Sequence, residues 1–305
     1  MGDEGTLVAA AVRVLQAASA EEKSRLTREA VAAWRSGRIS RCYGECDPAV
    51  PLRPARDKVV KIVAPGEVGR CGASSRPGGK TRFLLHNLVH IESWAVDLAW
   101  DAVARFGARE SMPRAFFDDF VRVAEEEDVH FGLLKARLEA LGGYYGESPA
   151  HEGLWESAEA TSGSLLARVA VEHCVHEARG LDRLPSTIAR FERAGDAETA
   201  RVLKEVVYPE EVTHCAVGLR WFRFLLEREE HGGVPGGEWA GPWAVPWRPT
   251  DPAGGRAESP EREAEVARRF REVVAANFHG ALKPPFNAEA RRAAGFTPEF
   301  YEPLA

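Results

Sequence analysis

Two segments of the chain repeat the order glutamate–x–x–histidine, each inside a stretch whose apolar residues recur at helical spacing. The first pairs Glu127 with His130, and the second pairs Glu211 with His214. A carboxylate on the apolar face of a helix is costly to bury unless something positive compensates its charge. The chain must therefore fold so that these two motifs meet and are neutralised in its interior.

Each motif is preceded by another glutamate at nearly the same distance. Glu92 lies 35 residues before Glu127, and Glu177 lies 34 residues before Glu211. The residues three, four and seven positions from Glu92 are mostly apolar, so its side chain should face the core. In an antiparallel helical hairpin, about 35 residues bring the chain back to nearly the same height. Each half of the chain therefore places a glutamate level with a Glu-x-x-His motif.

Helical periodicity predicts an all-α fold, because no stretch alternates apolar and polar residues for long enough to form a strand. We expect a four-helix bundle with extra N-terminal and C-terminal helices. The long helices are expected over residues 83–106, 113–141, 155–179 and 196–229, with shorter ones over 5–37 (two), 186–194 and 260–278. Gly180 and Pro185 should end the third long helix, Asp196 should cap the fourth, and Pro209 should kink the fourth.

Composition divides the chain into four parts: an N-terminal helical segment (1–50), a Pro/Gly-rich basic strap (51–82), the bundle (83–231) and a Trp-rich loop with a C-terminal helix and tail (232–305). The basic strap holds eight Lys and Arg residues against Asp57 and Glu67. The favoured interpretation is a loop that lies over an acidic bundle. A strap that binds anions or nucleic acid is the alternative.

Charge and composition exclude several classes of protein. The net charge of −6 gives no overall signature of a nucleic-acid or membrane binder. No apolar run is long enough to cross a membrane, and the N-terminus lacks the basic region of a signal peptide. The five cysteines are irregularly spaced, and Cys42 and Cys46 are too far apart for a zinc-binding CxxC pair. We therefore expect a reduced, cytoplasmic protein.

Four carboxylates and two imidazoles form the ligand set of a ferritin-like dinuclear site, in which one Glu from each of two helices joins a Glu-x-x-His from each of the others. Such ligands suit two iron ions, or iron with manganese. Without metal, the converging glutamates would repel one another and take up protons. The predicted metal ligands are Glu92, Glu127, His130, Glu177, Glu211 and His214.

Other polar residues in the same helices leave alternatives open. Glu172 is a rival of Glu177, but its face carries Arg168 and Arg179 and its spacing to Glu211 is longer. His86 and His90 are expected in supporting or surface positions, and His173 is a better candidate to support a ligand. Redox roles are possible for Tyr208 and Cys215, although packing is the favoured interpretation.

Several segments also resemble a known family. They include "HNLVHIESWAVDLAWDAVARF", "MPRAFFDDFVRVAEEEDVHFGLLKARLEALG", "AHEGLWESAEAT", "EARGLD", "EEVTHCAVGLRWFRFL" and "PFNAEARRAAGF". They are similar to an uncharacterised ferritin-like family, a domain of unknown function, over most of residues 51–296. The resemblance implies the ferritin-like fold and a dinuclear site on the six residues above. Pro209 and the Trp-rich loop at 234–247 depart from the pattern without removing a ligand.

The family itself supplies no substrate, and its similarity to a tRNA hydroxylase of the same superfamily is at fold level. Our leading hypothesis is a dinuclear iron protein that activates dioxygen to oxidise or hydroxylate an organic substrate. A ferroxidase or peroxide-detoxifying protein is the first alternative, and a structural or adaptor bundle with a non-catalytic metal is the second. RNA is a minority hypothesis for the partner, resting on the basic strap and the tryptophans. The small-molecule substrate, the electron donor and the oligomeric state stay open.

Overall fold

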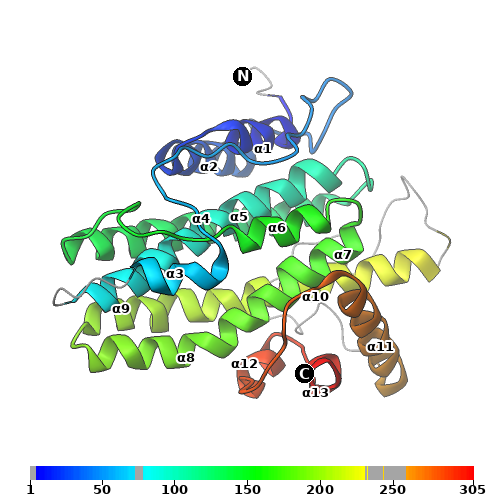
Figure 1. Cartoon of the computed structure of the whole chain (residues 1–305). Helices are drawn as coiled ribbons and strands as arrows, with labels where there is room; N and C mark the ends of the chain where they lie inside the picture. The colour runs from blue at the N-terminus through cyan, green and yellow to red at the C-terminus, as the bar shows by residue number, and fades with distance from the viewer. Residues whose placement is uncertain (1–4, 73–77, 231, 233–242, 244–258) are drawn as a thin grey trace.

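Helices form the architecture throughout the residues that the computed structural model describes, which are 5–72, 78–230, 232, 243 and 259–305. The predicted all-α class is confirmed, and the described residues contain no strand beyond two isolated bridges (Figure 1). None of their helices is both long and apolar enough to cross a membrane.

The N-terminal segment is a helical hairpin that packs on the bundle. Helix α1 (Leu7–Gln16) is capped by Thr6, and α2 (Ala20–Arg35) is capped by Ser19, whose side chain accepts the N–H of Glu22. The hairpin lies against α4 and α5 (Figure 1, blue). The apolar face of α1 is fully buried there, so this part of the chain belongs to the same core.

Helices α4 (Gly79–Phe106) and α5 (Arg114–Ala140) form the first long hairpin. Both agree with the sequence prediction, although α4 begins four residues earlier. Their interface is the most extensive between any two described elements. Pro113 lies at the N-cap of α5, where its missing N–H is not needed.

The third long helix does not follow the prediction of one helix over 155–179. The chain forms α6 (Gly153–Ala160), breaks at residues 161–164, and resumes in α7 (Leu165–Ala170). A π-helical turn (Val171–His176) then leads directly into α8 (Glu177–Arg193). The break coincides with the sequence Ser-Gly-Ser, where Ser164 caps α7 by accepting the N–H of Ala167.

The predicted end at Gly180 and Pro185 is therefore wrong, because α8 runs through both residues. Because Pro185 has no N–H, it cannot donate the helical hydrogen bond to the carbonyl of Leu181, four residues earlier. That carbonyl instead accepts a hydrogen bond from the side-chain amide of Asn287, at 3.1 Å. A residue more than 100 positions away thus satisfies the group that proline leaves unpaired.

The fourth long helix is continuous from α9 (Ala197–Val202) through a second π-helical turn (Leu203–Val207) into α10 (Tyr208–Glu230). Asp196 caps it as predicted, accepting the N–H of Thr199 at 3.1 Å. Pro209 is the second residue of α10, so its missing N–H lies within one turn of the change from π to α geometry.

The C-terminal helices α11 (Pro260–Asn277), α12 (Ala288–Ala293) and α13 (Pro298–Tyr301) cover one side of the bundle (Figure 1, orange to red). A buried ion pair joins Arg291 to Asp182 of α8, at 2.6 Å. The Trp-rich loop lies outside the described residues except for Trp243, which is buried and packs against Phe224 of α10.

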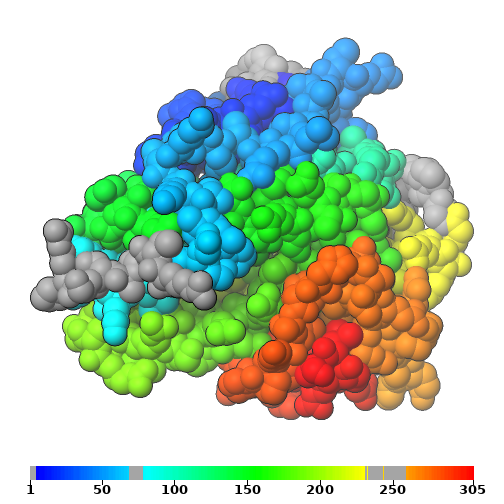
Figure 2. All heavy atoms as spheres, in the orientation of Figure 1, coloured from blue at the N-terminus to red at the C-terminus, as the bar shows by residue number. Residues whose placement is uncertain are grey.

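The basic strap crosses the face of the molecule that Figure 2 shows, with the short helix α3 (Pro65–Gly72) within it. Its arginines meet acidic groups of the bundle: Arg53 pairs with Glu152, Arg82 with Glu147, and Arg56 with Asp97 of α4. The guanidinium of Arg56 also stacks 3.8 Å above the ring of Trp94. These contacts favour the interpretation of the strap as a loop over an acidic bundle.

The carboxylate of Asp97 in α4 binds residues from two other parts of the chain, the helix α2 and the basic strap. It is fully buried, and it accepts from Lys23 of α2 at 2.6 Å as well as from Arg56 of the strap. A buried carboxylate with two cationic partners is well compensated, but each partner depends on it.

Replacing Asp97 by alanine should destabilise the protein by about 3–5 kcal/mol, because Lys23 would remain buried without its counter-charge. Urea unfolding followed by circular dichroism measures the change. The control is Glu198→Ala, which breaks an exposed pair with Arg201 and should leave the midpoint unchanged. Equal midpoints for the two variants would show that the buried pairs do not hold the N-terminal segment.

Candidate metal centre

The bundle brings the six sequence-predicted residues to one place in its interior. Glu92 comes from α4, Glu127 and His130 from α5, Glu177 from the first position of α8, and Glu211 and His214 from α10. Five of them are buried, and Glu177 is partly exposed. The two Glu-x-x-His motifs, separated by more than 80 residues, face each other with ring centroids 5.7 Å apart.

The six residues form two groups that share members. One group is Glu92, Glu127, His130 and Glu211, and the other is Glu127, Glu177, Glu211 and His214. Within each group, one donor atom per residue lies within 4.8 Å of every other. Glu127 and Glu211 belong to both groups. This is the arrangement expected of two neighbouring cations with shared carboxylates, and the assignment of bridging ligands remains a prediction.

Both histidines are oriented by a carboxylate on their outer side. His130 Nε2 lies 2.7 Å from Glu210 Oε2, and His214 Nε2 lies 2.8 Å from Glu126 Oε2. When Nε2–H donates to a carboxylate, the lone pair of the neutral imidazole is on Nδ1. Each Nδ1 faces the inner carboxylates, and His214 Nδ1 lies 2.9 Å from Glu127 Oε1. This is the carboxylate–histidine arrangement of metal sites.

The inner atoms are buried and make no well-aligned hydrogen bond, although His214 Nδ1 lies 2.9 Å from Glu127 Oε1 and His130 Nδ1 lies 3.4 Å from Glu127 Oε2. They are the Nδ1 atoms of His130 and His214 and the Oε2 atom of Glu127. Nearly all buried polar groups in proteins make good hydrogen bonds, so three poorly aligned atoms at one place require an explanation. All three are donor atoms for a metal ion. The residues present therefore fit a dinuclear site on the chemistry of their donors.

The electrostatics of the six residues point the same way. Burial, followed by the neighbouring carboxylates, raises the pKa of Glu92 and Glu177 well above the usual value. Burial also opposes the charge on Glu127, but His214 and His130 outweigh it and lower the pKa of this carboxyl. Without cations, protons on Glu92, on Glu177 and on the two histidines must balance the negative charge of the carboxylates. Two divalent ions would replace these protons.

The sequence prediction missed Glu126 and Glu210, which orient the histidines. Each precedes the glutamate of its own motif and contacts the histidine of the other motif. A signal was present, since both motifs read Glu-Glu-x-x-His. The contact itself depends on how α5 and α10 cross, which the sequence does not show.

Glu172, the rival of Glu177, belongs to neither group. It is buried, its Oε2 atom lies 3.8 Å from His176 Nε2, and burial raises its pKa to about 7. His86 and His90, expected in supporting or surface positions, belong to neither group, and both are buried, which excludes the surface alternative. His86 accepts the backbone N–H of Gly146 at 2.9 Å, and His90 links Tyr145 to Trp94.

Tyr208 and Cys215 occupy packing positions, as favoured. The hydroxyl of Tyr208 accepts a hydrogen bond from Asn287 at 2.7 Å, and Cys215 is fully buried beside the backbone of Cys174. His173 is also buried, and its ring packs edge-on against Phe120 with centroids 4.8 Å apart.

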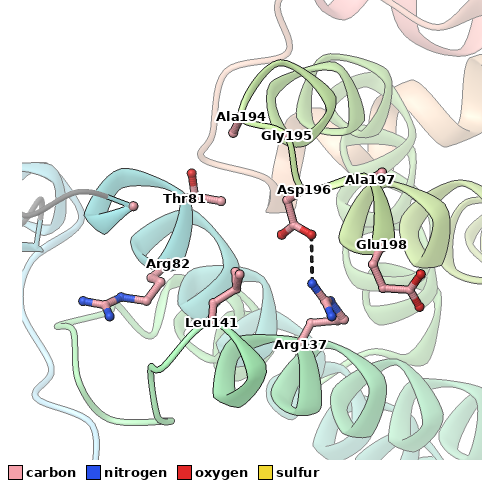
Figure 3. Close-up of a pocket in the computed structure, with 10 residues that line it drawn as sticks. Thr81, Arg82, Arg137, Leu141, Ala194, Gly195, Asp196, Ala197 and Glu198 are labelled. Carbon is pink, nitrogen blue, oxygen red and sulfur yellow. Dashed lines mark hydrogen bonds and ion pairs between the residues drawn. The ribbon is translucent and has the colours of Figure 1, made fainter.

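Four cavities among the described residues are lined by other residues than the six. The largest, about 440 Å³, lies between the start of α4, the end of α5 and the loop before α9. Arg137 and Asp196 pair across it at 2.9 Å (Figure 3). Arg137 lies two helical turns beyond His130, about 10 Å along α5.

Comparison with known proteins identifies relatives without a known activity. The family model "Protein of unknown function (DUF455)" matches residues 16–302. An uncharacterised protein of Haemophilus influenzae is 36% identical over 171 residues, which are 55% of this chain and 58% of that protein. The chain thus covers little more than half the length of this relative. No solved structure matches.

Substituting Glu210 by alanine should weaken the binding of divalent metal by about ten- to a hundredfold, because His130 loses the carboxylate that orients it. Competition with a chromophoric chelator measures the affinity. Glu125→Ala is the matched control, since Glu125 belongs to the same run of glutamates as Glu126 but pairs with Arg35 instead. If both variants bind metal as the wild type does, Glu210 has no part in the site.

Proposed function

The chain belongs to the DUF455 family, and we propose that it is a dinuclear non-haem iron (or iron–manganese) protein that activates dioxygen to oxidise an organic substrate. The observation that carries the proposal is the pair of overlapping groups with shared Glu127 and Glu211. The proposal includes the ferritin-like assignment, which the helix order and the duplicated Glu-Glu-x-x-His motif support.

In this proposal each ion has its own histidine and its own outer glutamate. His130 and Glu92 would hold one ion, His214 and Glu177 would hold the other, and Glu127 with Glu211 would bridge them. Carboxylates and imidazoles are ligands that suit iron and manganese. Ions held by these residues would supply the electrons that reduce dioxygen.

The protein's own contribution is to orient the ligands and to exclude water. Glu126 and Glu210 fix the rotation of the two imidazoles. On the interior side, the site borders a core that contains Phe120, Ala124 and Cys215, all fully buried. Exclusion of water from such a site prevents side reactions of a strong oxidant. Glu177 is the most exposed of the six, which favours entry of small molecules on its side.

A second function is favoured by one specific observation. None of the four cavities described above is lined by the six residues, so none of these four offers an organic molecule a pocket beside them. A ferroxidase or peroxide-detoxifying protein needs no such pocket. The third hypothesis, a structural or adaptor bundle, would use the ions as a staple and would not react with oxygen.

RNA is the weakest of the proposed partners. The arginines of the basic strap that pair with bundle acids are not free to neutralise phosphates. Trp221 and Trp243 are buried, so their faces are not available to stack on bases. A small molecule in a reducing, cytoplasmic setting is the partner that we propose.

Protein purified without chelators should contain about two metal ions per chain. After anaerobic loading with Fe(II) and exposure to oxygen, it should develop a near-ultraviolet band. The double variant Glu127→Ala/Glu211→Ala should show neither property, because it lacks the carboxylates that both groups share. Elemental analysis and stopped-flow absorption provide the two measurements.

Glu172→Gln is the control for loss of a buried carboxylate outside the two groups, and it should keep both properties. Oxidation of iron that continues beyond two equivalents per chain would favour metal handling over substrate oxidation. Bound metal without any reaction with oxygen would favour the structural role. A wild-type protein that holds no metal under these conditions would refute the proposed function.

A further inference from the structure

His173 is a buried imidazole close to the proposed centre that neither group uses. It lies four residues before Glu177, and Phe120, which its ring contacts, lies seven residues before Glu127. His173 itself lies in the π-helical turn that leads into Glu177, and its ring contacts Phe120 of α5. Glu127 and His214 are among the charged groups close enough to affect its pKa, so His173 lies near the inner groups of both motifs.

The Nε2 atom of His173 has no hydrogen-bond partner, although the residue is only 4% exposed. Burial, followed by the charge of Arg168, lowers the pKa of this imidazole to about 3. The ring is therefore neutral at pH 7 and can form one further hydrogen bond through Nε2. An unpaired polar atom in a core lowers stability, and such atoms are kept mainly where they have a function.

The backbone holds His173 in place through a close helix contact. A side chain at Gly218 of α10 would place its first carbon 1.9 Å from the carbonyl oxygen of His173. Glycine is therefore required at this crossing, and the π-helical turn and α10 approach each other more closely than helices with larger residues could. The imidazole is fixed between this contact and the ring of Phe120.

We propose that His173 forms one wall of a subsite for a small exogenous ligand of the metal centre, a molecule of the size of dioxygen or azide. The subsite would lie beside the His173 ring, where Nε2–H would donate a hydrogen bond to the bound molecule. This inference rests on the proposed function. It adds a binding residue that the Glu-x-x-His pattern does not contain.

The test uses azide as the probe, titrated into the iron-loaded, air-oxidised protein and followed by its charge-transfer absorption. His173→Phe should retain the metal content of the wild type but bind azide about ten- to a hundredfold more weakly, as expected for loss of a hydrogen bond to a charged group. His173→Gln keeps a hydrogen-bonding group and should restore most of the affinity.

A second readout needs no metal. The melting temperature of metal-free His173→Phe should equal or exceed that of the wild type, because an unpaired polar atom is removed. The matched control is His86→Phe, which removes a buried imidazole that accepts a backbone N–H. It should melt at a lower temperature and bind azide like the wild type.

Unchanged azide affinity in His173→Phe with full metal content would overturn the subsite and leave the metal centre intact. A fall in melting temperature as large as that of His86→Phe would show that His173 is a packed core residue, and would overturn the inference in the same way. A wild-type protein without metal would refute the proposed function instead, and the melting temperatures alone would then decide whether His173 is structural.

Discussion

The neutralisation of four converging carboxylates is the constraint on which the rest of the structure depends. Each of Glu92, Glu127, Glu177 and Glu211 lies on the inner face of a helix, where charge is strongly unfavourable without compensation. The negative charge can be compensated in two ways: some of the carboxylates can take up protons, or two cations can bind among all four. The long helices bring these groups to one place in the bundle interior. Glu126 and Glu210 then orient the two histidines that face them.

Much of this arrangement could be predicted from the sequence, because it depends on helical periodicity and on equal spacing within two hairpins. Those regularities are local. They place α4, α5 and α10 correctly and bring the six residues together, while the role of the six as metal ligands stays a prediction. The errors concern long-range contacts. Pro185 looks like the end of a helix until Asn287, far along the chain, satisfies the carbonyl that proline leaves unpaired.

The polar residues around the candidate centre show the same limit. A helical pattern shows that Glu126 and Glu210 lie next to inward-facing glutamates, but not that each crosses to the histidine of the other motif. The sequence leaves supporting and surface positions open for His86 and His90, because their partners, Gly146 and Tyr145, belong to a loop without periodicity. Burial of a polar side chain depends on which distant group pairs with it, and periodicity carries no such information.

The exchange of partners between the two motifs has a consequence for how the protein can change during evolution. Each Glu-Glu-x-x-His segment supplies the inner carboxylate for both proposed ions and the orienting carboxylate for the opposite histidine. The two halves of the bundle resemble each other in pattern, yet neither contains a complete binding unit. A substitution in one motif therefore changes how much the residues of the other motif contribute to binding the proposed ions. The two segments must accordingly diverge together.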